Sequence, residues 1–418
     1  MVSITHISID KDVDETVVSA LIKLPGFEDR AWFRVPAGLS PDHEAAADAF
    51  FVLGLVLAMG TDGRLNMDVQ VSKRLIYNAD AIQSIIVGWY PKRVRRIDHI
   101  DVAARDVDKP LIQGKKISCF TGGVDSFDTL VRNRHDIDAL LYVHGYDVPL
   151  HRTEIREATS KHLNEVAHET GIEFLEVSTN IRVFLNRAAT WSVITHGPAL
   201  AAVGHLLSPR FGTLVIPATH TFADKYAWGS HPLLDHLWSS YRLSVVHDGA
   251  GSTRVQKTRR LAQEPAARDH LRVCWQNTGK YNCGKCSKCV RTMIALELTG
   301  VLADFKTFDS HINLDDVREL KLTNMSGRSF VKENLDFATE QGHREIKEVL
   351  QAVIDEFDQS RGAVAQQKLA TSKGKTSIVV DQTQLRAVEK RIAGLERKVD
   401  KLERLWPVRA WRKLRGRS

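Results

Sequence analysis

The stretch KISCFTGGVDSFDTL, residues 116–130, decides the fold of this chain. Its apolar first part, which ends at Phe120, is typical of a buried strand, and two glycines separate it from a helical pattern that begins near Asp125 or Ser126. Glycines let a backbone approach an anion closely, and the amides of a helix N-terminus point at that anion. The stretch therefore predicts either a phosphate-binding loop or an ordinary Gly-Gly turn before an Asp or Ser helix cap.

Apolar stretches of strand length recur after this loop, and helical stretches separate them. They are ALLYVHG (139–145), IEFLEVS (172–178) and GTLVIPA (212–218). Strands that alternate with helices favour a parallel α/β sheet, whose ligands bind at the carboxyl ends of the strands. We therefore expect the glycine loop to lie at the ligand-binding edge of such a sheet.

Changes in composition divide the rest of the chain into regions. Residues 1–108 combine strand-like stretches, such as RLNMDVQVS (64–72), with an apolar helical run, which favours an accessory α+β domain. The regions expected after it are the α/β domain over 110–305, a mainly helical extension over 306–358, a polar linker over 359–381, and a coiled coil with a basic tail over 382–418.

The chain has 418 residues, 43% of them hydrophobic, which suits a folded protein with more than one core. Its net charge of +7 is carried mainly after Leu385, so the body is nearly neutral. The apolar run over 45–59 contains Asp48 and is shorter than the ~20 residues of a bilayer span, so we expect a buried helix. The N-terminal residues show no export signal, and we expect a cytoplasmic protein.

Four of the five cysteines lie close together in the sequence. Their spacing is C-x8-C-x2-C-x2-C, and in a reducing compartment such a cluster indicates metal ligands rather than disulfides. Four thiolates form the closed tetrahedral site of a structural zinc ion. An iron–sulfur cluster and chance clustering are the alternatives. The predicted zinc ligands are Cys274, Cys283, Cys286 and Cys289.

Together, the glycine loop and the cysteine pattern resemble the 7-cyano-7-deazaguanine synthase group of the PP-loop ATP pyrophosphatases. The resemblance covers about residues 112–300, and the cysteine spacing is its most specific part. It implies a Rossmann-like parallel sheet of the PP-loop type with a structural zinc knob. It also implies an enzyme that cleaves ATP between the α and β phosphates, activates a carboxylate as an adenylate and lets ammonia displace AMP.

The resemblance also assigns roles to residues of this chain. Lys257, in RVQKTRRLA (254–262), is similar in place to a family lysine that opens a helix before the zinc site, and with Asp125 and Ser126 it would form the catalytic group. Since Asp125 and phosphate repel one another, Mg²⁺ is expected to bridge them. The residues that match the ATP-binding loop are Thr121, where the family usually has Ser, Gly122, Gly123, Val124, Asp125 and Ser126.

The expected substrate region departs from the family pattern. The segments HGYDVPL (144–150) and WGSHPLLDHLW (228–238) do not match the segments that bind the deazapurine, which indicates a different acceptor. We therefore expect an ATP-dependent adenylate-forming ligase or amidating enzyme that acts on a small-molecule or protein-borne carboxylate. Its candidate substrate or nucleotide contacts are His144, Asp147, Ser230 and His231.

Two alternatives belong to other functional classes. A tRNA-thiolating PP-loop enzyme needs reactive cysteines, and only Cys119, within the predicted core strand, remains outside the cysteine cluster. A non-enzymatic scaffold could instead bind nucleic acid or membrane through the zinc knob and the basic tail, although the nearly neutral body argues against an extended phosphate-binding surface.

The C-terminal segment has the apolar spacing of a coiled coil. Charged residues fill most positions between the apolar ones, which favours self-association over 385–406, with a helix packed on the body as the alternative. Trp411 and Leu414 then lie among basic residues, a composition that suits an anionic membrane surface or nucleic acid. The apolar positions are Leu385, Val388, Ile392, Leu395, Val399, Leu402 and Trp406.

Overall fold

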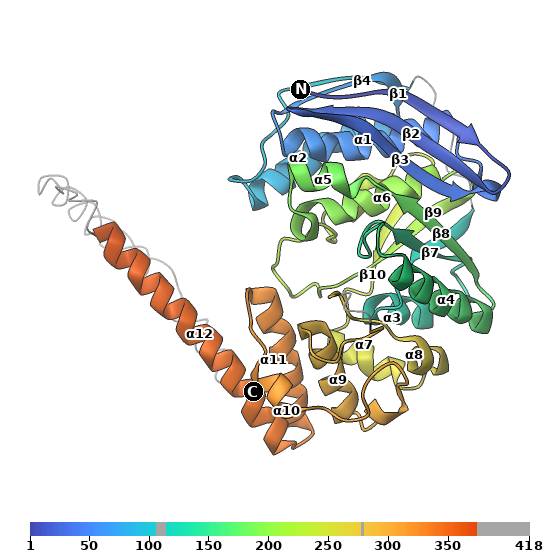
Figure 1. The fold of residues 1–418 in the computed structure, drawn as a ribbon. Helices are drawn as coiled ribbons and strands as arrows, with labels where there is room; N and C mark the ends of the chain where they lie inside the picture. The colour runs from blue at the N-terminus through green and yellow to red at the C-terminus, as the bar shows by residue number, and fades with distance from the viewer. Residues whose placement is uncertain (106–113, 277–279, 374–418) are drawn as a thin grey trace, which may run out of the picture. The chain divides into compact units, whose positions relative to one another are not determined.

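The computed structural model describes residues 1–105, 114–276 and 280–373, with only the backbone over 363–373 (Figure 1). The chain divides into two compact units, Met1–Phe357 and Asp358–Ser418. The fold and the candidate site belong to the first unit. Of the second unit, the structure describes the last part of one helix.

The first hundred residues form two helices packed with five strands. In chain order, these elements are β1 (Val2–Lys11), β2 (Glu15–Leu24), β3 (Phe27–Pro36), the 3-10 helix η1 (Ala37–Leu39), α1 (His43–Met59), β4 (Arg64–Val71), α2 (Lys73–Trp89) and β5 (His99–Ala104).

The next part of the chain alternates strands with helices, as its sequence predicts. Its elements are β6 (Lys115–Cys119), α3 (Val124–Asn133), β7 (Ala139–His144), α4 (Thr153–Thr170), β8 (Glu173–Thr179), α5 (Arg182–Ala188), the π-helix η2 (Trp191–Thr195), α6 (His196–Leu206), β9 (Phe211–Pro217), the 3-10 helix η3 (Asp235–Trp238), β10 (Ser244–Asp248), α7 (Arg254–Leu261), α8 (Pro265–His270) and α9 (Ser287–Leu298).

Within the described residues, ten strands form one sheet in the order β10-β9-β6-β7-β8-β3-β2-β1-β4-β5. The five strands from β10 to β8 are parallel, and their order reverses direction between β6 and β9. In open α/β sheets, ligands bind beyond the carboxyl ends of the strands at such a switch point. The glycine loop follows β6 and so lies at this switch point. The strand pairing confirms the prediction of an α/β fold with a mostly parallel sheet.

The sheet continues from the parallel strands into the N-terminal strands. β3 pairs antiparallel with β8, and the backbone N–H of Trp32 donates to Oδ1 of Asn180 at 2.9 Å while the Thr179 hydroxyl donates to the Trp32 carbonyl at 2.7 Å. The domain boundary that we place near residue 108 lies outside the described residues, and strands from both sides of it belong to the same sheet. The division of the chain into two compact units falls between Phe357 and Asp358.

Helices cover both faces of the parallel strands (Figure 1). In β7, Ala139, Leu141 and Val143 belong to one hydrophobic core and Leu140 and Tyr142 to another, because successive side chains of a strand point to opposite faces. Helices α1, α5 and α6 contribute to the first core, and α3, α4 and α8 contribute to the second. Helix α3, which follows the glycine loop, thus packs in the same core as α4 and α8.

Helix α1 is the buried helix predicted from the apolar run over 45–59, and its one charged residue within that run has partners. Asp48 accepts a hydrogen bond from the backbone N–H of Ser72 at 2.9 Å and pairs with Arg105 at 3.0 Å. Both side chains are buried. The carboxylate therefore ties α1 to the end of β4 and to the segment after β5.

Replacing Asp48 with Ala should lower the free energy of unfolding by about 3–5 kcal/mol, since it removes the nearest carboxylate from a buried guanidinium. Urea unfolding followed by circular dichroism measures this loss. Asp80 is the control, because it forms an exposed pair with Arg96 and its replacement by Ala should cost about 0–1 kcal/mol. Equal losses in the two variants would contradict the role of Asp48.

The C-terminal part of the first unit, within which we expect an extension over 306–358, is mainly helical. It contains η4 (Leu302–Asp304), α10 (Leu314–Arg318), α11 (Met325–Glu340) and the start of α12 (Arg344–Lys373). The linker expected over 359–381 begins within α12, because its Ala, Gln, Lys and Leu residues are good helix formers. The predicted coiled coil over 385–406 and the basic tail lie outside the described residues.

No helix in the described part of the chain is both long enough and apolar enough to cross a bilayer.

Candidate functional site

The glycine loop, residues 121–126, joins β6 to α3 at the switch point of the sheet. Gly122 has φ +71°, which favours glycine, and a Cβ there would lie 3.0 Å from Cδ2 of Leu163. Helix α3 begins at Val124, slightly earlier than predicted, and its N-cap residue Gly123 provides no side-chain cap. The amides of the first helical turn, which have no partners within a helix, are therefore free of a competing side-chain cap.

Asp125 lies in this first turn and is paired with two cations of α7. Its carboxylate accepts a hydrogen bond from Arg254 and lies 3.2 Å from Nζ of Lys257. Burial alone would raise the pKa of Asp125, but the attraction of Arg254 and Lys257 outweighs burial and lowers that pKa below its usual value. Lys257 is buried, and its ammonium also donates to the Ala218 carbonyl at 2.5 Å. Two of the three predicted catalytic residues, Asp125 and Lys257, thus meet where β6 and β9 end.

Contacts from three neighbouring helices hold α7 in place. The helix begins with a capping box formed by Thr253 and Gln256. A carboxylate of α11, from Glu333, accepts the backbone N–H of Arg254 at 2.8 Å. In α3, the buried carboxylate of Asp128 accepts a hydrogen bond from Nε of Arg260 at 2.7 Å. Since α7 also packs against α9, the positions of Arg254 and Lys257 are determined by the fold.

Arg291, on α9, completes a group of three cations that we call the basic cluster: Arg254, Lys257 and Arg291. The Arg291 guanidinium lies 4.1 Å from the ring centroid of Phe330. Burial and the nearby Arg254 lower the pKa of Arg291 to about 9, so it remains a cation at neutral pH. Within the described residues, Nε of Arg291 and Nε of Arg254 are buried and have no hydrogen-bond partner. The three positive charges of the cluster thus exceed the one negative charge of Asp125, and two of its N–H donors have no acceptor in the described part of the chain.

An aromatic group borders the basic cluster. His220, which follows β9, stacks on Phe330 with 5.2 Å between ring centroids, and its ring also contacts Trp228. Burial lowers the pKa of His220 to about 4, and the pair formed with Asp224 only partly opposes this shift. His220 is therefore a neutral ring at physiological pH.

The cysteine cluster (Cys274, Cys283, Cys286 and Cys289) is assembled in space, and its four sulfurs lie within 4.8 Å of one another. The Sγ of Cys289 lies 3.5 Å from that of Cys286 and 3.9 Å from that of Cys283. Thiolates bound to one zinc ion at about 2.3 Å are expected about 3.8 Å apart. The donor set and its geometry therefore fit a closed metal site such as structural zinc.

A short segment connects the cysteine cluster to the glycine loop. The side chain of Asn282 accepts the backbone N–H groups of Val273 and Cys274 at 2.9 and 3.1 Å and donates to the Leu271 carbonyl at 2.8 Å. Between these residues, the backbone N–H of Arg272 donates to the carbonyl of Gly122 at 2.7 Å. The cysteine cluster is thus linked through this segment to one side of the glycine loop.

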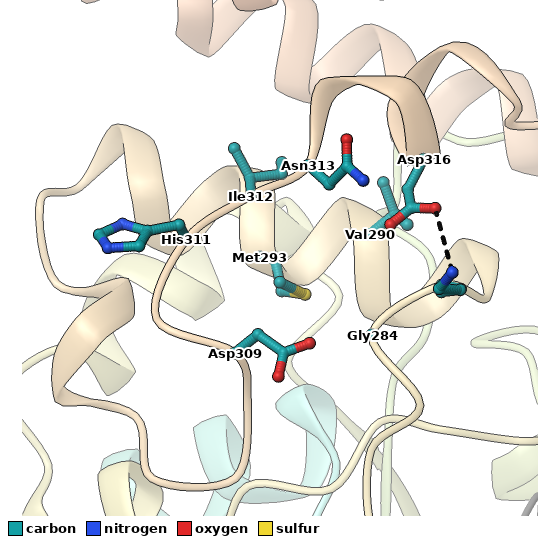
Figure 2. A pocket seen from close by; sticks show the side chains of 9 residues that line it. Gly284, Val290, Met293, Asp309, His311, Ile312, Asn313 and Asp316 are labelled. Atoms are coloured by element: carbon teal, nitrogen blue, oxygen red, sulfur yellow. Dashed lines mark ion pairs between the residues drawn. The ribbon is translucent and has the colours of Figure 1, made fainter.

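A small pocket beside the cysteine cluster does not compete with this site (Figure 2). Gly284, Met293 and Asp309 line it, and Lys285 pairs across it with Asp316 at 3.9 Å. Its volume is about 40 Å³, enough for ordered water, whereas pockets for small-molecule ligands span about 300–1,000 Å³.

The remaining predicted residues are placed differently. His144 is buried at the end of β7, where burial lowers its pKa and Nε2 lies 3.3 Å from the Pro149 carbonyl oxygen. Asp147 is exposed in the loop that follows. Ser230 donates to Asp235 at 2.6 Å, and the ring of His231 lies 4.8 Å from that of Trp89 in α2. Ser230 and His231 therefore have partners within the scaffold.

The predicted loop residues Thr121 and Ser126 flank the turn, and the Ser126 hydroxyl donates to the Gly123 carbonyl at 3.0 Å.

Sequence reasoning did not place Arg254, Arg291, His220 and Phe330 at the glycine loop. A signal existed for two of them: Arg254 is one helical turn before Lys257, and His220 follows the end of a predicted strand. Arg291 and Phe330 are distant in sequence from the loop, and only the packing of α9 and α11 brings them to it.

Comparison of the chain with known protein families, with curated proteins and with solved structures found no match.

Proposed function

We propose that this protein is an ATP-dependent ligase that activates a carboxylate as an adenylate and releases pyrophosphate. The observation that supports this function best is the convergence of the basic cluster on the first turn of α3 at the switch point of the sheet. Helix amides and cations in such an arrangement favour an anion with several charges. The sequence resemblance to PP-loop enzymes then selects ATP as the anion.

The residues at the loop can serve two states of the site. Without nucleotide, Asp125 neutralises part of the basic cluster. With nucleotide, Arg254 and Lys257 would turn to the β and γ phosphates, and the freed carboxylate would hold Mg²⁺, an ion that prefers oxygen ligands from carboxylates and phosphates. Mg²⁺ would supply further stabilisation of negative charge when bound. The ion pairs thus keep the charges balanced until the substrate arrives.

The chemical logic concerns the leaving group. A carboxylate resists attack until one of its oxygens becomes part of a good leaving group, here AMP. Cations and helix amides that bind the departing pyrophosphate more tightly as its charge develops lower the barrier for adenylation. The backbone amides of the first turn of α3 are held in place by the helix, so they need little reorganisation during this step. Zinc in the cysteine cluster would keep the loop in shape and take no part in the reaction.

The carboxylate that is activated belongs to a small molecule or to a protein. His220, Trp228 and Phe330 form an aromatic group next to Arg254 and Arg291, and we expect the adenine base or the acceptor to bind near it. Self-association through 385–406 and contact of the basic tail with membrane or nucleic acid stay predictions, since these residues are outside the described part. A cytoplasmic location also stays a prediction.

The tRNA-thiolation alternative gains no support from the free cysteine. Burial, together with the nearby Asp235, raises the pKa of Cys119 to about 12, so its thiol is protonated within β6. A sulfur carrier needs an accessible thiolate.

The function is tested by the products formed from ATP labelled at the α phosphate. The full chain, Mg²⁺, an ammonium salt as the nucleophile that displaces AMP, and pools of small carboxylic acids or acid-rich proteins are incubated together, and the nucleotides are separated by chromatography. We expect labelled AMP with an equal amount of pyrophosphate, and we expect labelled pyrophosphate to exchange into ATP. Formation of ADP and inorganic phosphate would contradict the proposal, as would failure of the protein to bind ATP in calorimetry.

A further inference from the structure

A second group of metal-ligating side chains lies away from both the basic cluster and the cysteine cluster. His162 and Glu165 belong to α4, and His270 is the last residue of α8. We call these three residues the histidine site. Residues three apart on a helix share one face, so His162 and Glu165 point together toward α8, against which α4 packs. The sequence gives no hint of this site, because more than one hundred positions separate the two histidines.

The three ligand atoms form a triangle of the size that one metal ion requires. Nδ1 of His162 lies 2.8 Å from Nδ1 of His270, and Oε2 of Glu165 lies 3.8 Å from the first nitrogen and 3.6 Å from the second. Nitrogen and oxygen ligands bound to zinc at about 2.0–2.2 Å in a tetrahedron are about 3.3–3.6 Å apart. An ion at the centre would need only small shifts of these side chains.

The surroundings of the triangle orient its ligands. Nε2 of His270 lies 3.1 Å from Oε1 of Glu169, the arrangement in which a carboxylate fixes the ring that binds a metal through its other nitrogen. The ring of His162 lies 4.1 Å from the ring of Tyr281 at 30°. His270 is buried, while His162 and Glu165 are partly open to solvent, so an ion has a path to the site.

We propose that the histidine site binds a divalent transition-metal ion, with Zn²⁺ as the best match. Two imidazoles and one carboxylate are typical zinc ligands. Mg²⁺ and Ca²⁺ prefer sites made of oxygen ligands alone, and soft ions such as Cu⁺ prefer thiolates. The three ligands leave one tetrahedral position for water or a substrate atom, in contrast to the closed cysteine cluster. One carboxylate balances half of the charge of the ion, and Glu169 adds a second carboxylate next to it.

The location of this ion gives it a positioning role. His270 and Cys274 would be bound to two different metals, and the segment between them contains the Arg272 N–H that donates to the Gly122 carbonyl at 2.7 Å. The His270 carbonyl oxygen lies 3.7 Å from the place of a Cβ on Gly122. The two ions would thus anchor both ends of the segment that supports the glycine loop. This inference does not depend on the reaction proposed for the loop.

Cobalt distinguishes the two metal sites in the full-length chain. After removal of bound metal, Co²⁺ is added stepwise and absorption spectra are recorded, because thiolate ligands give intense sulfur-to-cobalt bands and nitrogen or oxygen ligands do not. We expect two equivalents in the wild-type chain, one with and one without the thiolate bands. His162→Ala should lose the second equivalent only, and Glu169→Gln should weaken it by about 10–100-fold.

His168→Ala is the matched control, since His168 is an exposed residue of the same helix and should leave both equivalents unchanged. Glu165→Gln, which keeps the size of the side chain, tests the site even if His162→Ala folds poorly. Far-ultraviolet circular dichroism reports folding of each variant. A single equivalent in the wild-type chain would show that the two histidines form only a hydrogen-bonded pair, and two equivalents in both His162→Ala and Glu165→Gln would equally overturn the proposal.

Discussion

Asp125→Asn is expected to reduce the release of AMP and pyrophosphate from ATP by about 10³-fold or more. The carboxylate at this position is ionised, lies in the first turn of α3 and is within reach of both Arg254 and Lys257. An amide cannot hold Mg²⁺ with the same strength, and it leaves the basic cluster without its counter-charge. The measurement is the rate of AMP formation at saturating ATP and Mg²⁺.

Folding should survive this change, because Asn keeps the shape of the side chain and an oxygen that accepts from Lys257. Two further variants make the result specific. Asp136→Asn alters an exposed carboxylate paired with Lys116 and should retain full activity. Asp128→Asn alters the buried partner of Arg132 and Arg260 and should lower thermal stability. If Asp125→Asn kept activity within tenfold of the wild type, Asp125 would have no role in binding the metal or the phosphates.

The parallel half of the sheet was predictable because its signals are local. The apolar stretches that end near Phe120, Val143, Val177 and Ile216 each contain enough buried side chains to indicate a strand. β10 was missed because its five residues end in His247 and Asp248, and its pattern is short and mixed. The cysteine cluster was also predictable, since three of its ligands lie within seven residues and need only one turn and the start of a helix.

The continuation of the sheet could not be predicted from the sequence. The pairing of β3 with β8 is defined by only two residue pairs, at Phe33 and Arg34 of β3. These residues are followed by about 140 others before their partners, and no local pattern records such a contact. For the same reason, the three cations around Asp125 could not be grouped in advance. Lys257 was found by resemblance, whereas Arg291 required the packing of α9.

Cys286→Ser is expected to remove the metal from the cysteine cluster and to lower the stability of the fold by several kcal/mol. The Cys286 side chain is buried, its backbone N–H lies 3.3 Å from Sγ of Cys283, and it is the N-cap of α9. Loss of the metal should therefore loosen the start of the helix that carries Arg291. Elemental analysis and thermal unfolding measure the two effects, and ATP turnover should fall only as far as folding does.

Cys119→Ala is the matched control, because Cys119 is another buried cysteine but lies in β6, outside the cluster. It should retain one metal ion per chain in the cysteine cluster.

The choice between zinc and an iron–sulfur cluster follows from the distances between sulfurs. All four lie within 4.8 Å of one another, as ligands of a single ion do, whereas cysteines that bind different irons of a cluster are spread around it. Iron with acid-labile sulfide in the purified protein, or an unchanged metal content in Cys286→Ser, would contradict this assignment.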